Sequence, residues 1–434
     1  MKYAAYDKYK PSGIDWLPQA PTHWEIKGLR HVCRFAYGDA LAAENREEGD
    51  VAVYGSNGKV GTHDIPNTLA PVIVVGRKGS FGKLNYSKEP VFAIDTTYFI
   101  DKRHSSENLD WLAYALQPLK LDEASKDSAV PGLAREDAYK HKLPVPPLDE
   151  QQTIVRFLDA KTAQIDALVA QKRLLIAKLK EKRSALIART VTRGLPPEAA
   201  KAAGLEPNPE MKDSGVEWLG KVPKHWSTTR LKYAANRIID CPHDTPIYDP
   251  TGSYLVVRTA DIDSGTLDLS RAYRVDESEY LRRIRRAKVV PKDILYGREG
   301  ERWGYAALAP KETTVCLGQR MMQFQASVRF VPGFLMWHLN ARNVYEQGTL
   351  DVAGSTAPHV NVETIRNYLL AEPPQAEQVA IAAFIDSQTA QLDGLVAQIN
   401  EAITRLTEYR QALITSAVTG KIDVRNWQSE LEAA

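Results

Sequence analysis

The chain has 434 residues, of which 44% are hydrophobic and 25% charged, and its net charge is only +2. This balance is typical of a folded globular protein of about three domains, and it excludes a disordered chain or a small disulfide-stapled scaffold. The charge permits nucleic-acid binding without requiring it.

Residues 1–145 form the first predicted domain, which belongs to the α+β class. Glycine turns separate its short β-rich runs, and Asn57-Gly58 is typical of a tight hairpin loop. Strands are expected at residues 51–54, 72–75 and 91–94, and a helix at residues 109–117.

A long helix is predicted over residues 146–195. Pro146 and Pro147 precede two acids, which favours a helix start just after the prolines. Apolar residues then recur every seven positions, the pattern of a coiled-coil seam. The first seam position holds Leu158, Ile165, Lys172, Leu179 and Leu186, and the second is expected at Leu168 and Leu175. The following residues 196–212, rich in proline and alanine, are predicted to be a linker.

The second half of the chain repeats the first. Residues 12–24 (SGIDWLPQAPTHW) return at 214–226 with an offset of 202, and residues 146–195 return at 373–422 with an offset of 227. In the second pair 24 of 50 positions are identical, so we predict two equivalent helices. The offsets differ by 25, so the variable stretch between the matched blocks is longer in the second half.

A second α+β domain is predicted over residues 213–372, a second long helix over 373–422 and a C-terminal tail over 423–434. Strands are expected at 254–258, 294–296 and 321–325, and a short helix at 333–340. The seam of the long helix holds Ile385, Leu392, Ile399, Leu406 and Leu413, with Leu395 and Ala402 at the second position. The two long helices are natural coiled-coil partners, and the alternative is that each is a surface helix packed on its own domain.

Four tryptophans stand at repeat-equivalent positions beside prolines. They are Trp16, Trp24, Trp218 and Trp226. We interpret them as packing anchors against the long helices rather than as platforms for stacked bases.

The composition also bears on location. No uncharged apolar stretch approaches the roughly 18 residues of a membrane span, and the charged N-terminus is not typical of a signal peptide. Cys33, Cys241 and Cys316 are far apart and form no CxxC pair, which suits a reducing compartment. We therefore expect a cytoplasmic protein with no membrane partner.

The sequence carries no familiar catalytic motif. Residues 55–60 lack both the spacing and the hydroxyl of a GxxxxGK[ST] phosphate loop. No HExxH motif occurs, and the nine histidines and three cysteines show no metal-ligand spacing. The Asn/Asp-Pro-Pro-aromatic motif of amino-group methyltransferases is also absent. We predict no catalytic residue, metal site or cofactor in this chain.

Each predicted domain has a glycine-spaced basic turn after an apolar strand, at residues 76–82 and 297–304. Glycine lets a backbone approach phosphate closely, and arginine pairs with guanine edges or phosphates. The alternative is a tight turn with a solvated arginine, but the presence of the same glycine-spaced basic turn in both domains favours a DNA contact. The candidate DNA-binding residues here are Asn57, Lys59, Arg77, Lys78, Ser80, Lys83, Arg298 and Arg302.

Residues 280–288 (YLRRIRRAK) hold five cations in nine residues. Such a run suits backbone phosphates, and the alternative is the solvated face of a helix. Its candidate DNA-binding residues are Arg282, Arg283, Arg285 and Arg286.

These features together resemble the specificity subunit of type I restriction–modification systems. The sequence segments that carry the resemblance are SGVEWLG…VPKHW (214–226), GRKGSFGKLNYSKEPVFAIDTTYFI (76–100), PPLDEQQTIVRFLDAKTAQID (146–166) and AVTGKID (417–423). Val130-Pro-Gly-Leu133, which precedes PPLDEQ, also resembles this family. The linker is a departure, because it looks longer than the segment that usually joins the two halves of these subunits.

The resemblance implies two target recognition domains, each of which reads one half of a split double-stranded DNA site. It implies an internal pseudo-two-fold repeat in which the long helices form an antiparallel coiled coil, set the spacer and dock two methyltransferase subunits. Restriction/translocase subunits are further implied partners. S-adenosylmethionine, ATP and Mg would then belong to the partner subunits, which explains why their motifs are missing here.

Two alternatives remain open at this point. One is a DNA methyltransferase or nuclease with fused recognition domains, against which the missing motifs argue. The other is a coiled-coil scaffold that does not bind DNA, which would lack the salt-sensitive affinity that phosphate contacts produce.

Overall fold

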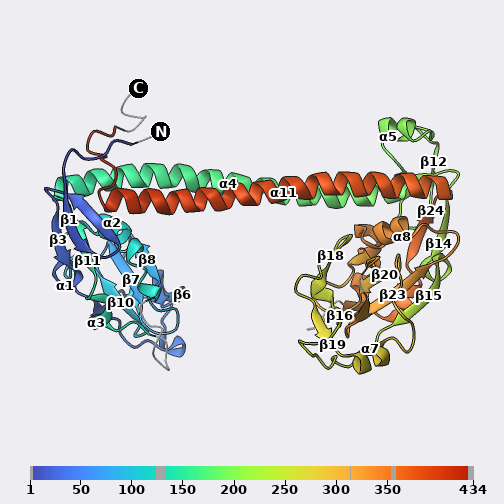
Figure 1. Ribbon diagram of the computed structural model, residues 1–434, viewed down its shortest axis with the longest axis horizontal. Helices are drawn as coiled ribbons and strands as arrows, with labels where there is room; N and C mark the ends of the chain where they lie inside the picture. The colour runs from blue at the N-terminus through green and yellow to red at the C-terminus, as the bar shows by residue number, and fades with distance from the viewer. Residues whose placement is uncertain (1–2, 124–131, 313, 353–357, 429–434) are drawn as a thin grey trace. The chain divides into compact units, whose positions relative to one another are not determined.

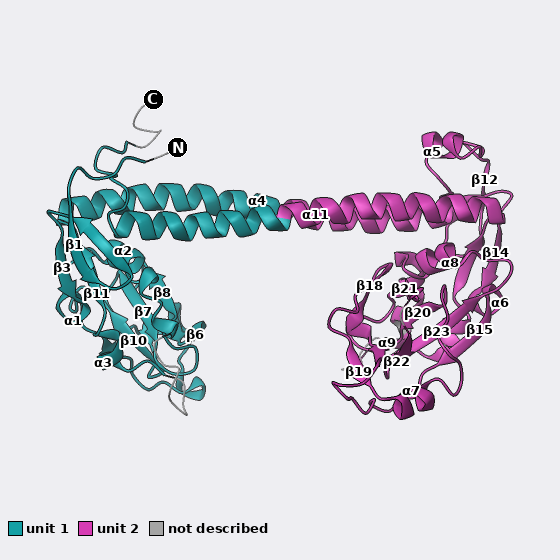
Figure 2. Cartoon of the chain, in the orientation of Figure 1, with its two compact units in different colours: residues 1–173, 400–434 teal, residues 174–399 magenta. Residues whose placement is uncertain are grey.

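The computed structural model describes residues 3–123, 132–312, 314–352 and 358–428. The chain divides into two compact units: residues 1–173 with 400–434, and residues 174–399 (Figure 2). Each unit contains one α+β domain together with part of both long helices.

Both predicted long helices are present (Figure 1). Helix α4 (Leu148–Arg193) has 46 residues and helix α11 (Gln375–Val418) has 44. Each begins after a Pro-Pro pair and carries an acid in its first turn, where the helix dipole favours negative charge. The segment predicted as a linker contains a short helix, α5 (Pro197–Ala202).

Burial agrees with the predicted first seam position. Leu158, Ile165, Ile385, Leu392 and Leu413 are buried. The other apolar members are half-buried, namely Leu179, Leu186, Ile399 and Leu406.

The predicted second seam position was wrong for three of its four residues, whereas the fourth, Ala402, is half-buried. Leu168, Leu175 and Leu395 are 41%, 47% and 47% exposed. Residues four positions after each first-position residue fill the seam instead, and they include the half-buried Val169, Ile176, Val396 and Ile403. Spacings of three and four residues both stay near one helix face, so apolar character alone does not choose between them.

Two reciprocal ion pairs fix how the helices pair. In one unit Arg183 Nε lies 3.0 Å from Asp393 Oδ1, and in the other Arg410 Nε lies 2.9 Å from Asp166 Oδ1. The repeat offset relates them, because 166 + 227 = 393 and 183 + 227 = 410. Both pairs join residues whose numbers sum to 576, so the helices run antiparallel in one register.

The first domain contains a four-stranded antiparallel sheet and a three-stranded sheet. The described elements are β1 (Tyr9–Ile14), β2 (Leu17–Pro21), β3 (Glu25–Gly28), α1 (Leu29–Val32), β4 (Ala36–Tyr37), η1 (Ala43–Asn45), β5 (Val51–Gly55), β6 (Gly58–His63), β7 (Val72–Gly76), β8 (Leu84–Ser87), β9 (Phe92–Ala93), β10 (Thr97–Ile100), α2 (Leu109–Ala115), η2 (Gln117–Leu119), η3 (Leu121–Glu123), α3 (Arg135–Ala138) and β11 (Lys142–Val145). The sheet orders are β4-β10-β7-β8 and β6-β5-β9. The core also includes Leu413, Ile414 and Val418, so the end of α11 is part of this domain's packing.

The second domain repeats the four-stranded sheet. The described elements are β12 (Met211–Asp213), β13 (Lys221–Pro223), β14 (Ser227–Arg230), α6 (Leu231–Ala234), β15 (Ala235–Asp240), β16 (Tyr254–Val257), η4 (Thr259–Asp261), β17 (Ile262–Asp263), β18 (Thr266–Leu267), β19 (Tyr273–Val275), α7 (Glu277–Arg283), β20 (Ile294–Gly297), β21 (Ala306–Leu308), β22 (Val315–Leu317), β23 (Met321–Ala326), α8 (Pro332–Leu339), α9 (Arg342–Val352), α10 (Val362–Arg366) and β24 (Leu369–Glu372). Its order β15-β23-β20-β21 matches β4-β10-β7-β8 of the first domain, and the other larger sheet is β19-β16-β22. The core includes Ile187 and Val191 at the end of α4.

The strands predicted at the centre of each domain are confirmed, with small shifts. The run at residues 91–94 shortens to β9. The hairpin loop comprises residues 56–57, because Gly55 pairs with Gly58 and places Gly58 in the next strand. The predicted turn is therefore real but lies one residue earlier.

Two of the four tryptophans fasten the domains to the long helices, as predicted. Trp24 is fully buried and its Nε1 donates to Glu150 of α4 at 3.1 Å. Trp226 is 1% exposed and its Nε1 donates to Glu377 of α11 at 2.9 Å. The preceding histidine of each motif, His23 or His225, contacts the same carboxylate. Trp16, by contrast, is 40% exposed.

The next residue of each helix makes a second attachment. Gln151 Oε1 accepts from the backbone N–H of Asn108, the N-cap residue of α2, at 2.9 Å. Gln378 Oε1 accepts from the backbone N–H of Val331, the N-cap residue of α8, at 2.8 Å. The repeated Glu-Gln pair therefore holds both an N-terminal segment and a helix start in each domain.

The C-terminal segment packs on the first unit as far as the structure describes it. Val424 is buried, and the Trp427 ring lies 5.5 Å from that of Phe157. Among the described residues, neither the long helices nor the short ones have the apolar run that a membrane span requires.

Candidate nucleic-acid interface

The first basic turn is a closed loop that follows β7. The Gly76 N–H donates to the Lys83 carbonyl and the Gly82 N–H donates to the Gly76 carbonyl, both at 2.8 Å. Gly82 has φ +71°, and a Cβ there would lie 2.1 Å from the backbone nitrogen of Asp122. Glycine at this position is therefore a packing requirement, and the turn presents Arg77 directly after the strand.

The second basic turn has the same backbone frame after β20. The Gly297 N–H donates to the Tyr305 carbonyl at 2.9 Å, and the Gly304 N–H donates to the Gly297 carbonyl at 2.8 Å. Arg298 therefore leaves its sheet at the position equivalent to Arg77.

The structure brings the first-domain candidates together. Lys83 Nζ donates to both the backbone oxygen and Oδ1 of Asn57, at 2.7 and 2.9 Å, so the hairpin tip lies against the turn. Lys59, Lys78 and Ser80 are exposed nearby in the same two segments. We refer to one set of six as the basic turn surface: Asn57, Lys59, Arg77, Lys78, Ser80 and Lys83.

Arg77 is held by an aromatic ring rather than by a carboxylate. Its guanidinium carbon lies 4.9 Å from the centre of the Tyr37 ring, and Nη1 donates to the Asp95 carbonyl at 3.0 Å. Arg135 lies 4.4 Å from the same ring, which is 48% exposed. Within the described residues, neither arginine forms an ion pair with an acid. Their charges are therefore oriented but not neutralised, which suits an anionic or base-edge partner.

Arg298 has a different environment, which contradicts its predicted place at the DNA-facing surface. Its side chain is only 6% exposed and pairs with Asp240 at 3.0 Å and with Glu299. Burial would raise the pKa of Glu299, but the hydrogen bond from Arg298 and the nearby His359 hold it below its ordinary value. Arg298 therefore stabilises the turn of the second domain, because its charge is already compensated.

The basic run at 280–288 likewise contains both arginines that are paired with acids and arginines that are exposed. Arg283 is buried, with its side chain paired to Glu279 at 2.9 Å, and Arg282 pairs with Glu279 and Asp244. The structure does not support Arg283 as a phosphate contact, because its guanidinium faces the interior. Arg285, Arg286 and Arg302 are exposed, and Arg286 donates to the Asp240 carbonyl at 3.0 Å.

Asp240, Cys241 and His243 place their ligand atoms within 4.8 Å of one another. His243 Nε2 lies 2.9 Å from Asp240 Oδ2, which Arg298 also contacts, and the Met321 N–H donates to Cys241 Sγ. Burial raises the pKa of the Cys241 thiol. This arrangement is a hydrogen-bonded charge network rather than a set of free metal ligands.

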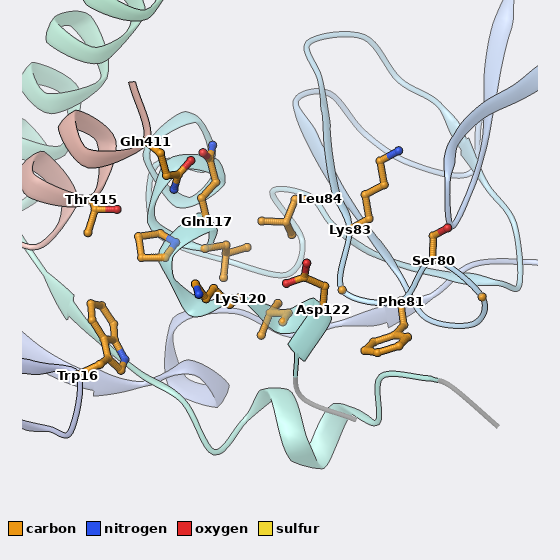
Figure 3. A pocket seen from close by; sticks show the side chains of 15 residues that line it. Trp16, Ser80, Phe81, Lys83, Leu84, Gln117, Lys120, Asp122, Gln411 and Thr415 are labelled. Carbon is orange, nitrogen blue, oxygen red and sulfur yellow. The ribbon is translucent and has the colours of Figure 1, made fainter. Parts of the chain in front are cut away.

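A cavity of about 800 Å³ adjoins the basic turn surface in the first unit (Figure 3). Ser80, Phe81 and Lys83 line it from the turn, and Trp16 and Gln411 line it from other segments. The turn is therefore open to a partner on this side.

Sequence reasoning missed Tyr37 and Arg135, which complete the environment of Arg77. Both are distant from Arg77 in the chain, and β4 and α3 bring them to it. It also missed Asp240, whose carboxylate decides the role of Arg298. No local pattern marks these residues, because each acts through a contact between distant segments.

The fold and the two turns define a class of protein: two related but unlike α+β domains on a repeated pair of long helices. The model of the type I restriction modification DNA specificity domain matches residues 21–177 and 251–405, well over half of the chain. The chain therefore belongs to the type I restriction modification DNA specificity family.

Individual relatives agree with this assignment. The chain is 25% identical over 370 residues to the Escherichia coli type I restriction enzyme EcoBI specificity subunit, covering 82% of this chain and 75% of that protein. It is 21% identical over 302 residues to the EcoKI specificity subunit of E. coli strain K12, covering 66% and 59%. A solved chain from a type I R-M system assembly shares the fold, with a TM-score of 0.63 at 14% identity over 93% of this chain and 99% of that chain. These likenesses give no support to a fused methyltransferase or nuclease, or to a scaffold without DNA.

Proposed function

We propose that this chain is the non-catalytic DNA-reading subunit of a type I restriction–modification complex. Each domain reads one half of an asymmetric bipartite site, and the long helices set the spacing. The observation that carries this is the pair of turns, which share one backbone frame and differ in their side chains. Two domains of one kind with unlike side chains suit a site with two different halves.

In the first domain the basic turn surface is the DNA-contacting surface. Arg77 supplies an oriented guanidinium for a base edge or phosphate, and the exposed Lys59 and Lys78 add phosphate contacts. In the second domain this role falls to Arg285, Arg286 and Arg302, which are exposed, while Arg298 has a positioning role.

The partners are two methyltransferase subunits and the restriction/translocase subunits. S-adenosylmethionine, ATP and Mg bind to those subunits, since this sequence has none of the motifs that bind them. Exposed leucines on the long helices support docking there, because a group of apolar side chains left exposed on one element is typical of an interaction surface. These are Leu168, Leu174, Leu175 and Leu395.

The non-catalytic assignment is tested with S-adenosylmethionine. We expect titration calorimetry to detect no binding to the purified chain, because no motif for the cofactor is present. The complex reconstituted with its methyltransferase subunits serves as the positive control. Stoichiometric cofactor binding to the chain alone would falsify the assignment.

Arg77→Ala should weaken binding to the bipartite site by about 1–3 kcal/mol and relax selection at one base pair of one half-site. The loss follows because the Arg77 guanidinium is oriented by the Tyr37 ring and the Asp95 carbonyl but pairs with no acid among the described residues, so its charge is available to DNA. Arg298→Ala is the contrasting variant. It should instead destabilise the second unit by about 3 kcal/mol even without DNA, because it removes the arginine partner of two largely buried carboxylates, Asp240 and Glu299, and leaves each with only a histidine. Competition gel shifts and denaturant unfolding measure the two effects. Unchanged DNA binding by Arg77→Ala would show that the first turn is purely structural.

A further inference from the structure

A second cationic feature lies in the first domain, away from the basic turn surface. It is a shallow groove of about 430 Å³ between α1 and the loop that follows β10. Arg30 and Arg34 line it from the α1 side, and Lys102 and Arg103 line it from the loop. We refer to it as the α1 groove.

The charge of the groove is mostly uncompensated. Arg103 pairs with Asp101, whose side chain is fully buried. Burial would raise the pKa of Asp101, but the hydrogen bonds from Arg103 and from the Leu69 N–H lower it to about 2, so this carboxylate stays ionised. Arg30, Arg34 and Lys102 are exposed and form no ion pair with any acid among the described residues. Arg30 Nε donates to His31 Nε2 at 3.0 Å, so three positive charges line the groove without an acidic partner among the described residues, in a chain whose net charge is only +2.

The groove is built by defined contacts rather than by loose surface side chains. The backbone N–H of Arg34 donates to the His104 carbonyl at 2.8 Å, and Ser105 Oγ donates to the Val32 carbonyl at 2.8 Å. These bonds tie the loop to α1 and fix the distance between the two walls. The Cys33 thiol beneath is buried, which raises its pKa to about 12, so it remains neutral and removes none of the positive charge.

The repeat-equivalent place in the second domain lacks this character. The 202 offset relates Arg30, His31 and Arg34 to Lys232, Tyr233 and Asn236. Tyr233 is 60% exposed there. The second domain therefore presents an aromatic side chain and one fewer cation where the first presents cations.

We infer that the α1 groove binds the phosphate backbone of double-stranded DNA, at a contact separate from the basic turn surface. This rests on the DNA-reading function proposed above. Phosphate is favoured over an acidic protein surface because the groove combines cations with the exposed hydroxyl of Ser106, while its apolar members Val32 and Cys33 are buried.

The two surfaces lie at opposite ends of one strand. Thr97 at the start of β10 pairs with Gly76, next to Arg77, whereas Asp101 follows Ile100 at the end of β10. Thr97 and Asp101 are four residues apart, which in an extended strand is about 13 Å. Substitutions in the groove therefore leave the basic turn surface untouched, and the contact should add affinity without reading sequence.

The test is the salt dependence of DNA binding by the full chain. The groove variant combines Arg30→Gln, Arg34→Gln and Lys102→Gln. The matched control combines Lys8→Gln, Lys88→Gln and Lys140→Gln, which removes the same charge from exposed positions of the same domain. The probe is a random-sequence duplex of about 40 base pairs, measured at several salt concentrations.

Each phosphate contact contributes about 0.9 to the slope of log affinity against log salt. We expect the slope of the groove variant to decrease in magnitude by about 2 to 3, with the control close to the unaltered chain and half-site selection unchanged in both. An equal slope for groove variant and control, with normal binding by the unaltered chain, would overturn the inference alone. A groove variant that binds DNA normally but no longer assembles with the methyltransferase subunit would also overturn it, in favour of an acidic protein partner. Absence of salt-dependent binding by the unaltered chain would overturn the proposed function itself.

Discussion

A matched seven-residue insertion in both long helices should widen the gap between the two recognised half-sites by about three base pairs. Seven residues preserve the heptad seam and lengthen each helix by about 10 Å, while DNA rises about 3.4 Å per base pair. The insertion points follow from the register of the ion pairs, in which facing residue numbers sum to 576. Insertions after Lys172 and after Ile403 face each other and leave both ion pairs intact.

The bases read at each end should not change, because neither domain is altered. Three base pairs also rotate one groove by roughly a quarter to a third of a turn, so the selected spacer should reflect both length and twist. The measurement is binding-site selection from a library with randomised half-sites and variable spacers, with the methyltransferase partner present.

An insertion in α4 alone is the control. It displaces Arg183 from Asp393 by about two turns and should disrupt helix pairing rather than shift the spacer. An unchanged spacer with altered half-sites in the matched variant would contradict the proposal that the long helices set the spacing, because it would assign sequence reading to the helices.

Trp226→Ala should destabilise the second unit by about 3–5 kcal/mol, the cost of removing a fully packed tryptophan. The Trp226 ring packs in the core that includes Ile187 and Val191 of α4, and its Nε1 donates to Glu377 of α11. One side chain therefore connects the domain with both long helices. We expect the variant to lose recognition of the second half-site, while the first domain still reads the first half-site.

Two further variants divide this effect. Trp226→Phe keeps most of the buried ring but loses the hydrogen bond to Glu377, and we expect a smaller cost of about 1–3 kcal/mol. Trp218→Ala, in the same repeated motif but only half-buried, is the matched control and should change stability little. Hydrogen exchange resolved by segment is the appropriate measurement, because two units need not unfold together. Equal losses in Trp226→Ala and Trp218→Ala would show that Trp226 is not the anchor.

Part of the site was accessible to sequence reasoning because its pattern is local. The glycine spacing predicted both turns, and the hydrogen bonds show that they share one frame. The same reasoning treated Arg77 and Arg298 as equivalent, which the structure contradicts. Asp240 ends a strand far from Arg298 in the chain, and only the sheet order brings them together.

The sequence by itself determined the architecture of this protein. Repeats at offsets of 202 and 227, and a seven-residue period through Ile385 and Leu413, specify two domains and two paired helices, because periodicity is a property of neighbouring residues. The tertiary structure decided which charges are free to meet DNA. Arg283 and Arg298 are neutralised by acids folded against them, whereas Arg77 meets a ring and Arg30, Arg34 and Lys102 meet no acid among the described residues. A buried charge requires a partner and an exposed one does not, so the role of each arginine depends on the segments that folding places beside it.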